Sequence, residues 1–296
     1  MAVMTERTVG ILAPEIWRER RKAHEERVQP WIAPRLERCS LGQKHPVDDF
    51  LFEYYGYRPA LLRRWHPGLG VALGGESARE YLAYSGYTEC EGGVAADLTR
   101  LSASRREGLR WLANFLHATT ERPPQFGCAG LHEWAMVYRV AEVRHAAWPL
   151  RLPAAEIEEV VRGHGLRCTH YDAFRFFTEE ARPLNRWQPS RDRAPALEQR
   201  GCLHANMDLY KWSQKLAPFS PSDLITDCFA LARDARSLDM RASPYDLAAL
   251  GYPPVRIESV EGRAEYEAAQ RAFAERALPL RRRLRDVCER VITAEI

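Results

Sequence analysis

Apolar residues recur at the spacing of an α-helix along most of the chain. Leu109, Leu112, Phe115 and Leu116 form one such stripe, which predicts a helix over residues 104–118. Similar spacing, together with Ser and Pro at expected helix starts, marks further stretches. These predicted helices cover residues 14–28, 46–57, 59–65 and 220–238, and a long C-terminal helical segment covers about 262–296.

Strand signals are weak by comparison. Short runs at 163–168 and 257–260 are the best strand candidates. Residues 181–200 are rich in Pro, Arg and Asn and lack periodicity, which predicts an ordered loop or lid. The pattern therefore predicts a mainly α protein with a few short strands, folded as a single compact helical domain over residues 1–296.

The composition is typical of a globular protein. The chain has 296 residues, of which 46% are hydrophobic, so it can bury a sizeable core. Its formal net charge of +3 permits nucleic-acid binding without requiring it. Its seven cysteines include no CxxC pair, which indicates reduced thiols. Because we find neither a signal peptide nor an apolar run of about 18 residues, we expect a cytoplasmic protein that does not enter the membrane.

Candidate chemistry lies in four clusters that each pair a histidine with an acid. His204 and Asp208 are four residues apart, so on a helix they share one face. Aromatic and apolar residues surround this pair and the other three. Four such clusters predict one polar site assembled inside a packed core, which indicates an enzyme. The other three are His45 with Asp48 and Asp49, His132 with Glu133, and His170 with Asp172.

Each cluster also has a structural interpretation. Thr169 to Asp172 fits a capping box at a helix start. His132 and Glu133 begin like the HExxH helix of zinc proteases, but Met136 stands where the second histidine must be. His45 precedes two acids, as expected at the first turn of a helix. For His204 and Asp208 the structural interpretation is a buried histidine that is hydrogen-bonded to its own helix neighbour.

Several well-defined signatures are absent from the sequence. We find no GxxxxGK[ST] loop, no GxGxxG motif after a strand, no GxSxG elbow and no HxE…PCxxC pair. Nucleotide hydrolysis, Rossmann redox chemistry, α/β-hydrolase chemistry and base deamination are therefore disfavoured.

Several segments together resemble one known family. They are His45–Phe52, Tyr54–Tyr55 with Arg58–Pro59, Arg64–Gly68, Gly130–Tyr138, Arg167–Phe177 and Gly201–Trp212. The chain is similar, from about residue 14 to its end, to mainly actinobacterial proteins commonly labelled 3-methyladenine DNA glycosylase. The resemblance implies hydrolysis of the N-glycosidic bond of a modified base in DNA, which leaves an abasic site. It implies no cofactor and no obligate protein partner, and a place in DNA repair.

Base excision suggests a role for each candidate residue. A flipped base must stack between aromatic side chains, and a carboxylate must stabilise the sugar cation and orient water. An alkylated base or a hypermodified base of phage DNA, as in phage defence, would fit such a pocket. We expect walls from Trp134, Tyr138, Tyr171, Phe174, Tyr210 and Trp212, catalysis by Asp208, Asp172, His204, His170 and Glu133, and phosphate contacts from Arg63, Arg64, Arg105 and Arg106.

Two alternatives use the same residues differently. Histidines and acids on facing helices also hold metals in di-iron proteins, although the doubled Glu-x-x-His pattern of ferritin-like chains is missing. This alternative is a metal-dependent oxygenase or hydrolase that acts on a small molecule with a divalent transition metal such as iron. A second alternative is a non-enzymatic helical DNA-binding protein. The metal ligands would come from His45, His132, Glu133, His170, Asp172, His204 and Asp208.

Overall fold

A computed structural model of the chain describes residues 10–140, 143 and 147–294. It is mainly helical with one small sheet, which confirms the predicted fold class. Contacts divide the chain into two compact units. Unit 1 comprises Met1–Asn114, Tyr210–Cys228 and Arg282–Ile296, and unit 2 comprises Phe115–Leu209 and Phe229–Arg281. A single domain over residues 1–296 stays a prediction.

The helices follow the sequence periodicity closely in the second half of the chain. The helices expected at 220–238 and 262–296 are observed as α10 and α11, displaced by a few residues at their ends. Among the described residues, no helix is both long and apolar enough to span a membrane. The α-helices are α1 Pro14–Ser40, α2 Phe50–Tyr54, α3 Pro59–Arg63, α4 Ala103–Glu121, α5 Leu131–Ala135, α6 Ala154–His164, α7 Tyr171–Phe174, α8 Ala194–Leu197, α9 Leu203–Lys215, α10 Ser222–Arg241 and α11 Val260–Thr293.

Two predictions about local structure are wrong. Residues 163–168 form the end of α6 and a single bridge from Leu166 to Asn185, and residues 257–260 lead into α11. Residues 181–200 form a mostly irregular, ordered segment, as expected, which contains the short helices η2 Arg182–Leu184 and α8. Other 3₁₀ helices are η1 Glu76–Ala83 and η3 Ala248–Leu250.

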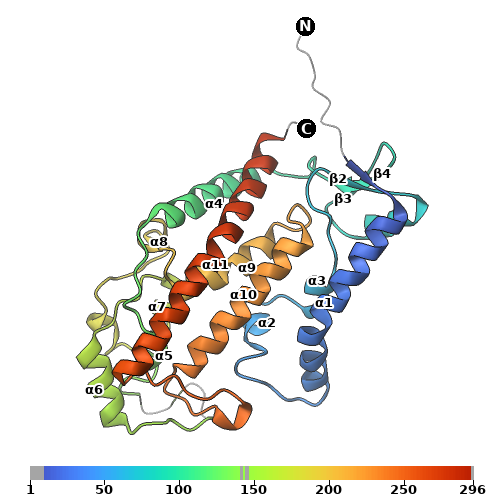
Figure 1. Cartoon of the computed structure of the whole chain (residues 1–296). Helices are drawn as coiled ribbons and strands as arrows, with labels where there is room; N and C mark the ends of the chain where they lie inside the picture. Colours follow the sequence, from blue (N-terminus) through green and yellow to red (C-terminus); the bar gives the residue numbers. More distant parts are fainter. Residues whose placement is uncertain (1–9, 141–142, 144–146, 295–296) are drawn as a thin grey trace. The chain divides into compact units, whose positions relative to one another are not determined.

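The sheet lies in unit 1 and was not expected from the sequence. Its strands are β1 Gly10–Leu12, β2 Val71–Gly74, β3 Tyr87–Cys90 and β4 Gly93–Ala96, in the order β1-β2-β4-β3. β1 runs parallel to β2, and the other neighbours are antiparallel. Strands β2, β3 and β4 are labelled in Figure 1. Gly93 lies so close to β2 that a Cβ atom there would stand 2.1 Å from the carbonyl oxygen of Leu73. Only glycine permits this strand pairing.

Aromatic side chains of unit 1 pack on this sheet. Trp17 of α1 is fully buried, and its Nε1 donates to the carbonyl oxygen of Gly74 at 3.0 Å. Its ring meets the edge of Tyr81 with the centroids 5.9 Å apart. Leu73 and Val94 complete the same buried cluster. The first turns of α1 are therefore fixed to β2 by one hydrogen bond and by ring packing.

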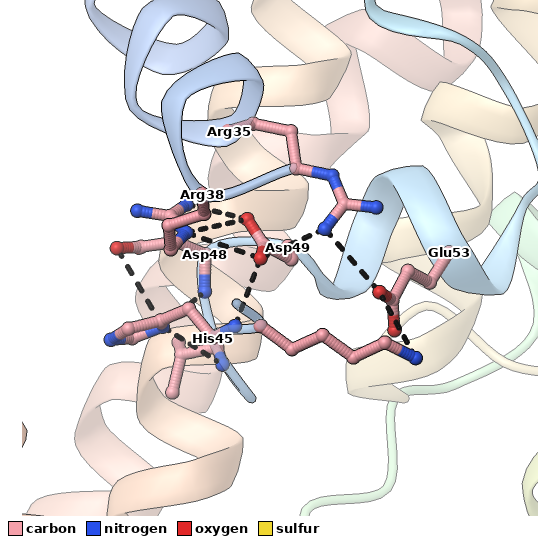
Figure 2. Close-up of polar contacts among 8 residues, drawn as sticks. Arg35, Arg38, His45, Asp48, Asp49 and Glu53 are labelled. Carbon is pink, nitrogen blue, oxygen red and sulfur yellow. Dashed lines mark hydrogen bonds and ion pairs between the residues drawn. The ribbon is translucent and has the colours of Figure 1, made fainter. Parts of the chain in front are cut away.

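Unit 1 also contains the first of the predicted His/acid clusters, and there its role is structural (Figure 2). Asp49, fully buried, accepts hydrogen bonds from Arg35 at 2.9 Å, Arg38 at 2.5 Å and the backbone N–H of His45 at 2.9 Å. The Nδ1 atom of His45 accepts from the backbone of Val47 and Asp48. His45 thus closes a turn before α2, which explains why that helix begins at residue 50. The structure does not place His45 among the metal ligands proposed from the sequence.

Removal of the Asp49 charge tests this network. Burial alone would raise the pKa of Asp49, but hydrogen bonds from Arg38 and the His45 backbone outweigh it and lower the pKa. We predict that Asp49→Asn lowers the free energy of unfolding by about 2–3 kcal/mol at pH 7, because charged hydrogen bonds are lost. Urea unfolding measures this loss.

The pH dependence and a neighbouring residue provide the controls. Because the folded pKa of Asp49 is lowered, its stabilising contribution is complete above the unfolded pKa of about 3.9. It is then lost as the pH falls through the folded value. The difference between the wild type and Asp49→Asn should therefore shrink in acid. Asp48, with 34% of its side chain exposed, should tolerate Asn with a change below about 1 kcal/mol. Equal losses at both positions would contradict the role assigned to Asp49.

Candidate active site in unit 2

Three of the four predicted clusters contribute to one buried polar group in unit 2. His132 and Glu133 come from α5, His170 immediately precedes α7, and His204 and Asp208 lie one turn apart on α9. All five are buried. The helical spacing of His204 and Asp208 thus places both side chains in the same interior, as the sequence predicted.

Arg236 of α10 neutralises the acids on one side of this group. Its Nη1 atom donates to Glu133 at 2.8 Å and to Asp239 at 2.9 Å. All three side chains are at most 6% exposed. Arg236 and Asp239 are three residues apart on α10, so they share a face. Because buried carboxylates are stable only when paired, this guanidinium permits both acids in the core.

His132 lies against the other oxygen of Asp239. Its Nε2 atom is 2.5 Å from Oδ1 of Asp239, and its Nδ1 atom is 3.9 Å from the sulfur of Cys128. Burial disfavours the imidazolium, but the Asp239 carboxylate outweighs burial and raises the pKa of His132 well above its usual value. The same pair lowers the pKa of Asp239, against its own burial.

His204 occupies the centre of the three histidines. Its ring meets His132 edge-on at 4.5 Å and stacks on His170 at 5.3 Å between centroids. Burial, followed by the charge of His132, lowers the pKa of His204 well below its usual value. The site therefore places a neutral imidazole directly beside a charged one.

His170 is held in one tautomer by its neighbours. Its Nδ1 atom accepts from the backbone N–H of Ala173 at 3.2 Å, so His170 caps α7. The proton then resides on Nε2, which donates to Asp208 at 3.3 Å and lies 3.6 Å from Glu198. The residue that caps α7 is thus His170, whereas the capping box allowed by the sequence would begin at Thr169. Asp208 acts on the site by orienting this imidazole.

A cavity of about 240 Å³ lies beside His132 and His204. Arg167 and Arg186, which are exposed to solvent, and Gln270, which is buried, are among the residues that line the cavity. Its walls combine aromatic, amide and thiol groups. The lining residues are Gln125, Phe126, Gly127, Cys128, His132, Arg167, Cys168, Thr169, Arg186, Trp187, Gln199, Cys202, Leu203, His204, Tyr266 and Gln270.

The aromatic residues predicted to stack on a base do not line this cavity. Trp134 is fully buried and donates from Nε1 to the Ala242 carbonyl at 2.8 Å. Tyr138, also buried, accepts from Arg162. These two rings and Phe174, which packs on Phe177, are core residues. The aromatic side chains on the cavity lining are Phe126, Trp187 and Tyr266.

The remaining predicted residues lie elsewhere. Tyr171 is half-buried on α7 and does not line the cavity. Asp172 has 34% of its side chain exposed and lies 3.5 Å from Arg175, so it is not part of the buried group. Tyr210 and Trp212 belong to unit 1, where they pack on Tyr57 and Trp111.

The four predicted phosphate-binding arginines also belong to unit 1. Arg63 donates to Gln29, and the guanidinium of Arg64 lies 3.8 Å from the ring centre of Tyr84. Arg106 donates to the backbone of Val291, and Arg105 is exposed. Arg105 and Arg63 remain available for contact with a polyanion. Arg64 and Arg106 have packing roles.

Sequence reasoning missed Asp239, Arg236 and the cysteines of the cavity. Asp239 and Arg236 lie on the buried face of α10, in register with Phe229 and Ala232. An acid and a base on an otherwise apolar stripe are a readable signal, because such groups are buried only when paired. The cysteines lack that signal, since a buried thiol packs like any small apolar group.

The arrangement joins proton-transfer groups, paired acids and a ligand-sized cavity within one unit. Searches with protein-family models, among curated proteins and among solved structures found nothing that matches this chain. The chemistry therefore has to be inferred from the side chains themselves.

Loss of Arg236 should be costly. We predict that Arg236→Met lowers the free energy of unfolding by about 3–5 kcal/mol, because Glu133 and Asp239 lose their buried counter-charge. Urea unfolding of the full chain provides the measurement.

Arg276→Ala supplies the control. Arg276 pairs with Asp234 in the same unit at 2.5 Å, but both side chains are more than 40% exposed. Its loss should cost about 1 kcal/mol or less. Comparable losses in the two variants would contradict the central place given to Arg236.

Proposed function

We propose that the protein is a DNA glycosylase that receives a modified base in the cavity beside His132 and His204. The observation that carries the proposal is the make-up of this cavity. Aromatic rings, amide groups and exposed arginines surround a space that adjoins a buried His/acid group. A flipped nucleotide needs these three kinds of contact, for its base faces, its base edges and its phosphates.

The size of the cavity favours a single base. Sites for drug-sized ligands occupy about 300–1,000 Å³. The 240 Å³ here is smaller, and it suits one heterocycle better than a dinucleotide or a folded peptide. The rest of the nucleic acid would then stay outside, along the rim.

Gln270 gives the cavity a group that can recognise a base edge. Its Nε2 atom donates to the Gly201 carbonyl at 2.6 Å, which fixes the orientation of the amide. Its Oε1 atom is buried and has no hydrogen-bond partner among the described residues. An unpaired buried acceptor favours a ligand that supplies an N–H donor, as base edges do.

The rim supplies positive charge. Arg167 and Arg186 are exposed, and the guanidinium of Arg186 lies 5.0 Å from the ring centre of Trp187. Arginine binds phosphate through two parallel hydrogen bonds. These two residues take over, in this proposal, the phosphate contacts first expected from unit 1.

The buried acids support the chemistry indirectly. No carboxylate is on the cavity lining; Asp208 orients His170, and Asp239 contacts His132. Negative charge behind the histidines favours the positive charge that develops on the sugar as the base departs. Asp208 is thus a positioning residue, and the histidines on the lining are nearest the substrate.

A non-enzymatic binding protein is the weaker interpretation. In such a protein, we would expect the histidines and acids to be dispersed, each serving as a helix cap or as part of a surface ion pair. In unit 2 these groups converge and are buried, at a cost that binding alone does not explain.

Excision is tested directly on DNA. We predict that the full chain forms alkali-sensitive abasic sites in duplex DNA with alkylated bases or in hypermodified phage DNA. Asp208→Asn should reduce the rate by about 10- to 100-fold at unchanged KM, because the orientation of His170 is lost. Asp172→Asn, outside the buried group, should retain the wild-type rate. Intact DNA with every substrate, or equal loss in both variants, would refute this assignment.

Gln270→Leu tests the recognition of the base. We predict a rise in KM of about 10-fold or more with little change in stability, since the substrate loses the acceptor for its N–H group. Gln188→Leu, at an exposed position outside the cavity, is the matched control and should leave KM unchanged. A normal KM in the folded Gln270→Leu protein would remove Gln270 from the recognition of substrate.

A second candidate function is a metal-dependent oxygenase or hydrolase acting on a small molecule. The convergence of His132, His204 and Asp239 favours it, because their ligand atoms all lie within 4.8 Å of one another. Chelator treatment separates the two functions: abasic-site formation that persists in a metal-free protein supports the glycosylase alone.

A further inference from the structure

The contact between His132 and Asp239 does not have the geometry of an ordinary hydrogen bond. Nε2 and Oδ1 are 2.5 Å apart, yet neither atom has a hydrogen-bond partner among the described residues. Both are buried. A buried ion pair this close, without the angles of a hydrogen bond, requires an explanation.

His204 directs a third ligand atom to the same place. One of its ring nitrogens lies within 4.8 Å of the ligand atoms of His132 and Asp239. Its ring contacts the other histidines by packing, and no hydrogen bond to its side chain is formed among the described residues. Two imidazoles and one carboxylate, brought by α5, α9 and α10, therefore converge inside unit 2.

We propose that His132, His204 and Asp239 bind one divalent transition-metal ion. Two imidazoles and a carboxylate are the donor set of catalytic zinc sites and of the facial triad of non-haem iron enzymes. Ligand bonds of about 2.0–2.2 Å place neighbouring donor atoms roughly 3–3.5 Å apart, for octahedral to tetrahedral angles. The pair at 2.5 Å has to open by about 0.5–1 Å, and the ion then binds both atoms together with a nitrogen of His204.

The surrounding side chains hold these ligands in place. Arg236 donates to Oδ2 of Asp239, which leaves Oδ1 for the ion, and its same Nη1 atom also donates to Glu133. The Nδ1 atom of His132 faces the sulfur of Cys128. Metal-binding histidines and carboxylates are commonly fixed by such outer contacts.

The ion would also face the substrate space. His132 and His204 line the cavity, whereas Asp239 lies behind them. Three protein ligands leave at least one coordination position for water or substrate, as in catalytic sites. A metal here is independent of what the cavity binds, so it does not rest on the glycosylase assignment.

A buried salt bridge is the competing explanation for the same atoms. It accounts for a close contact of His132 with Asp239, but it leaves Oδ1 and Nε2 without hydrogen-bond geometry and gives His204 no partner. The metal accounts for all three. The two explanations differ in one measurable property, which is stoichiometric uptake of a metal ion.

Metal uptake by the purified full chain decides between them. The protein is incubated with Co²⁺, Zn²⁺ or, without oxygen, Fe²⁺, then desalted and analysed by mass spectrometry of the elements. We expect about one ion per chain, a visible Co²⁺ absorption band and a rise in Tm with the metal concentration. Asp239→Asn and His204→Gln should each abolish uptake.

The control variant is His164→Gln, at a half-buried histidine that contacts Arg263 and lies outside the cluster. It should bind metal as the wild type does. If Asp239→Asn does not fold, His204→Gln alone carries the comparison, and circular dichroism shows which variants are folded. Folded wild-type protein with no more metal than His204→Gln would overturn the proposal. Because the readout is metal content, loss or retention of base excision does not enter the result.

Discussion

The buried guanidinium of Arg236 is the interaction on which the site of unit 2 depends. It holds Glu133 and Asp239 by hydrogen bonds of 2.8 and 2.9 Å in a region where none of the three is more than 6% exposed. Without it, two carboxylates would be buried without compensation, and they would take up protons or the core would open. His132 on one oxygen of Asp239 and Arg236 on the other together outweigh burial and lower the pKa of this carboxyl group. Glu133, Arg236, Asp239 and His132 therefore form one row of alternating charges. The charge of each side chain affects the protonation of its neighbour.

His132 and His204 have different neighbours, and their pKa values are therefore shifted in opposite directions. His132 has a carboxylate against it, whereas His204 has imidazoles on both sides, so the pKa of the first is raised and that of the second is lowered. Both rings also line the cavity. A ligand there meets a donor and an acceptor of protons, or two metal ligands, on one wall. Asp239 and Asp208 contact histidines and are not among the residues that line the cavity. Their negative charges therefore act on the cavity through the histidines.

The sequence predicted the helical class and several helices because apolar periodicity is a local property. The stripe of Leu109, Leu112 and Phe115 needs no distant contact to be recognised. The sheet could not be predicted in this way, because its strands have three or four residues and are defined by pairing, such as that of Leu73 with Val94. The site was predictable where histidine and acid lie on one helix. It was missed where the partners are far apart in the chain, as His132 and Asp239 are.

The His/acid clusters of the two units look alike in sequence but differ in how their acids are satisfied. Asp49 receives hydrogen bonds from Arg35, Arg38 and the backbone of His45, and these account for both of its oxygens. Such a carboxylate has no capacity left for chemistry, and its role is to stabilise a turn. Asp239 has one oxygen bound to Arg236 and another that lies close to His132 without a hydrogen bond. This second oxygen is the one that the metal ion proposed above would bind. The clusters also differ in burial, because His45 and Asp48 are partly exposed whereas His132, His204 and Asp239 are buried. The function proposed for unit 2 rests on these two differences.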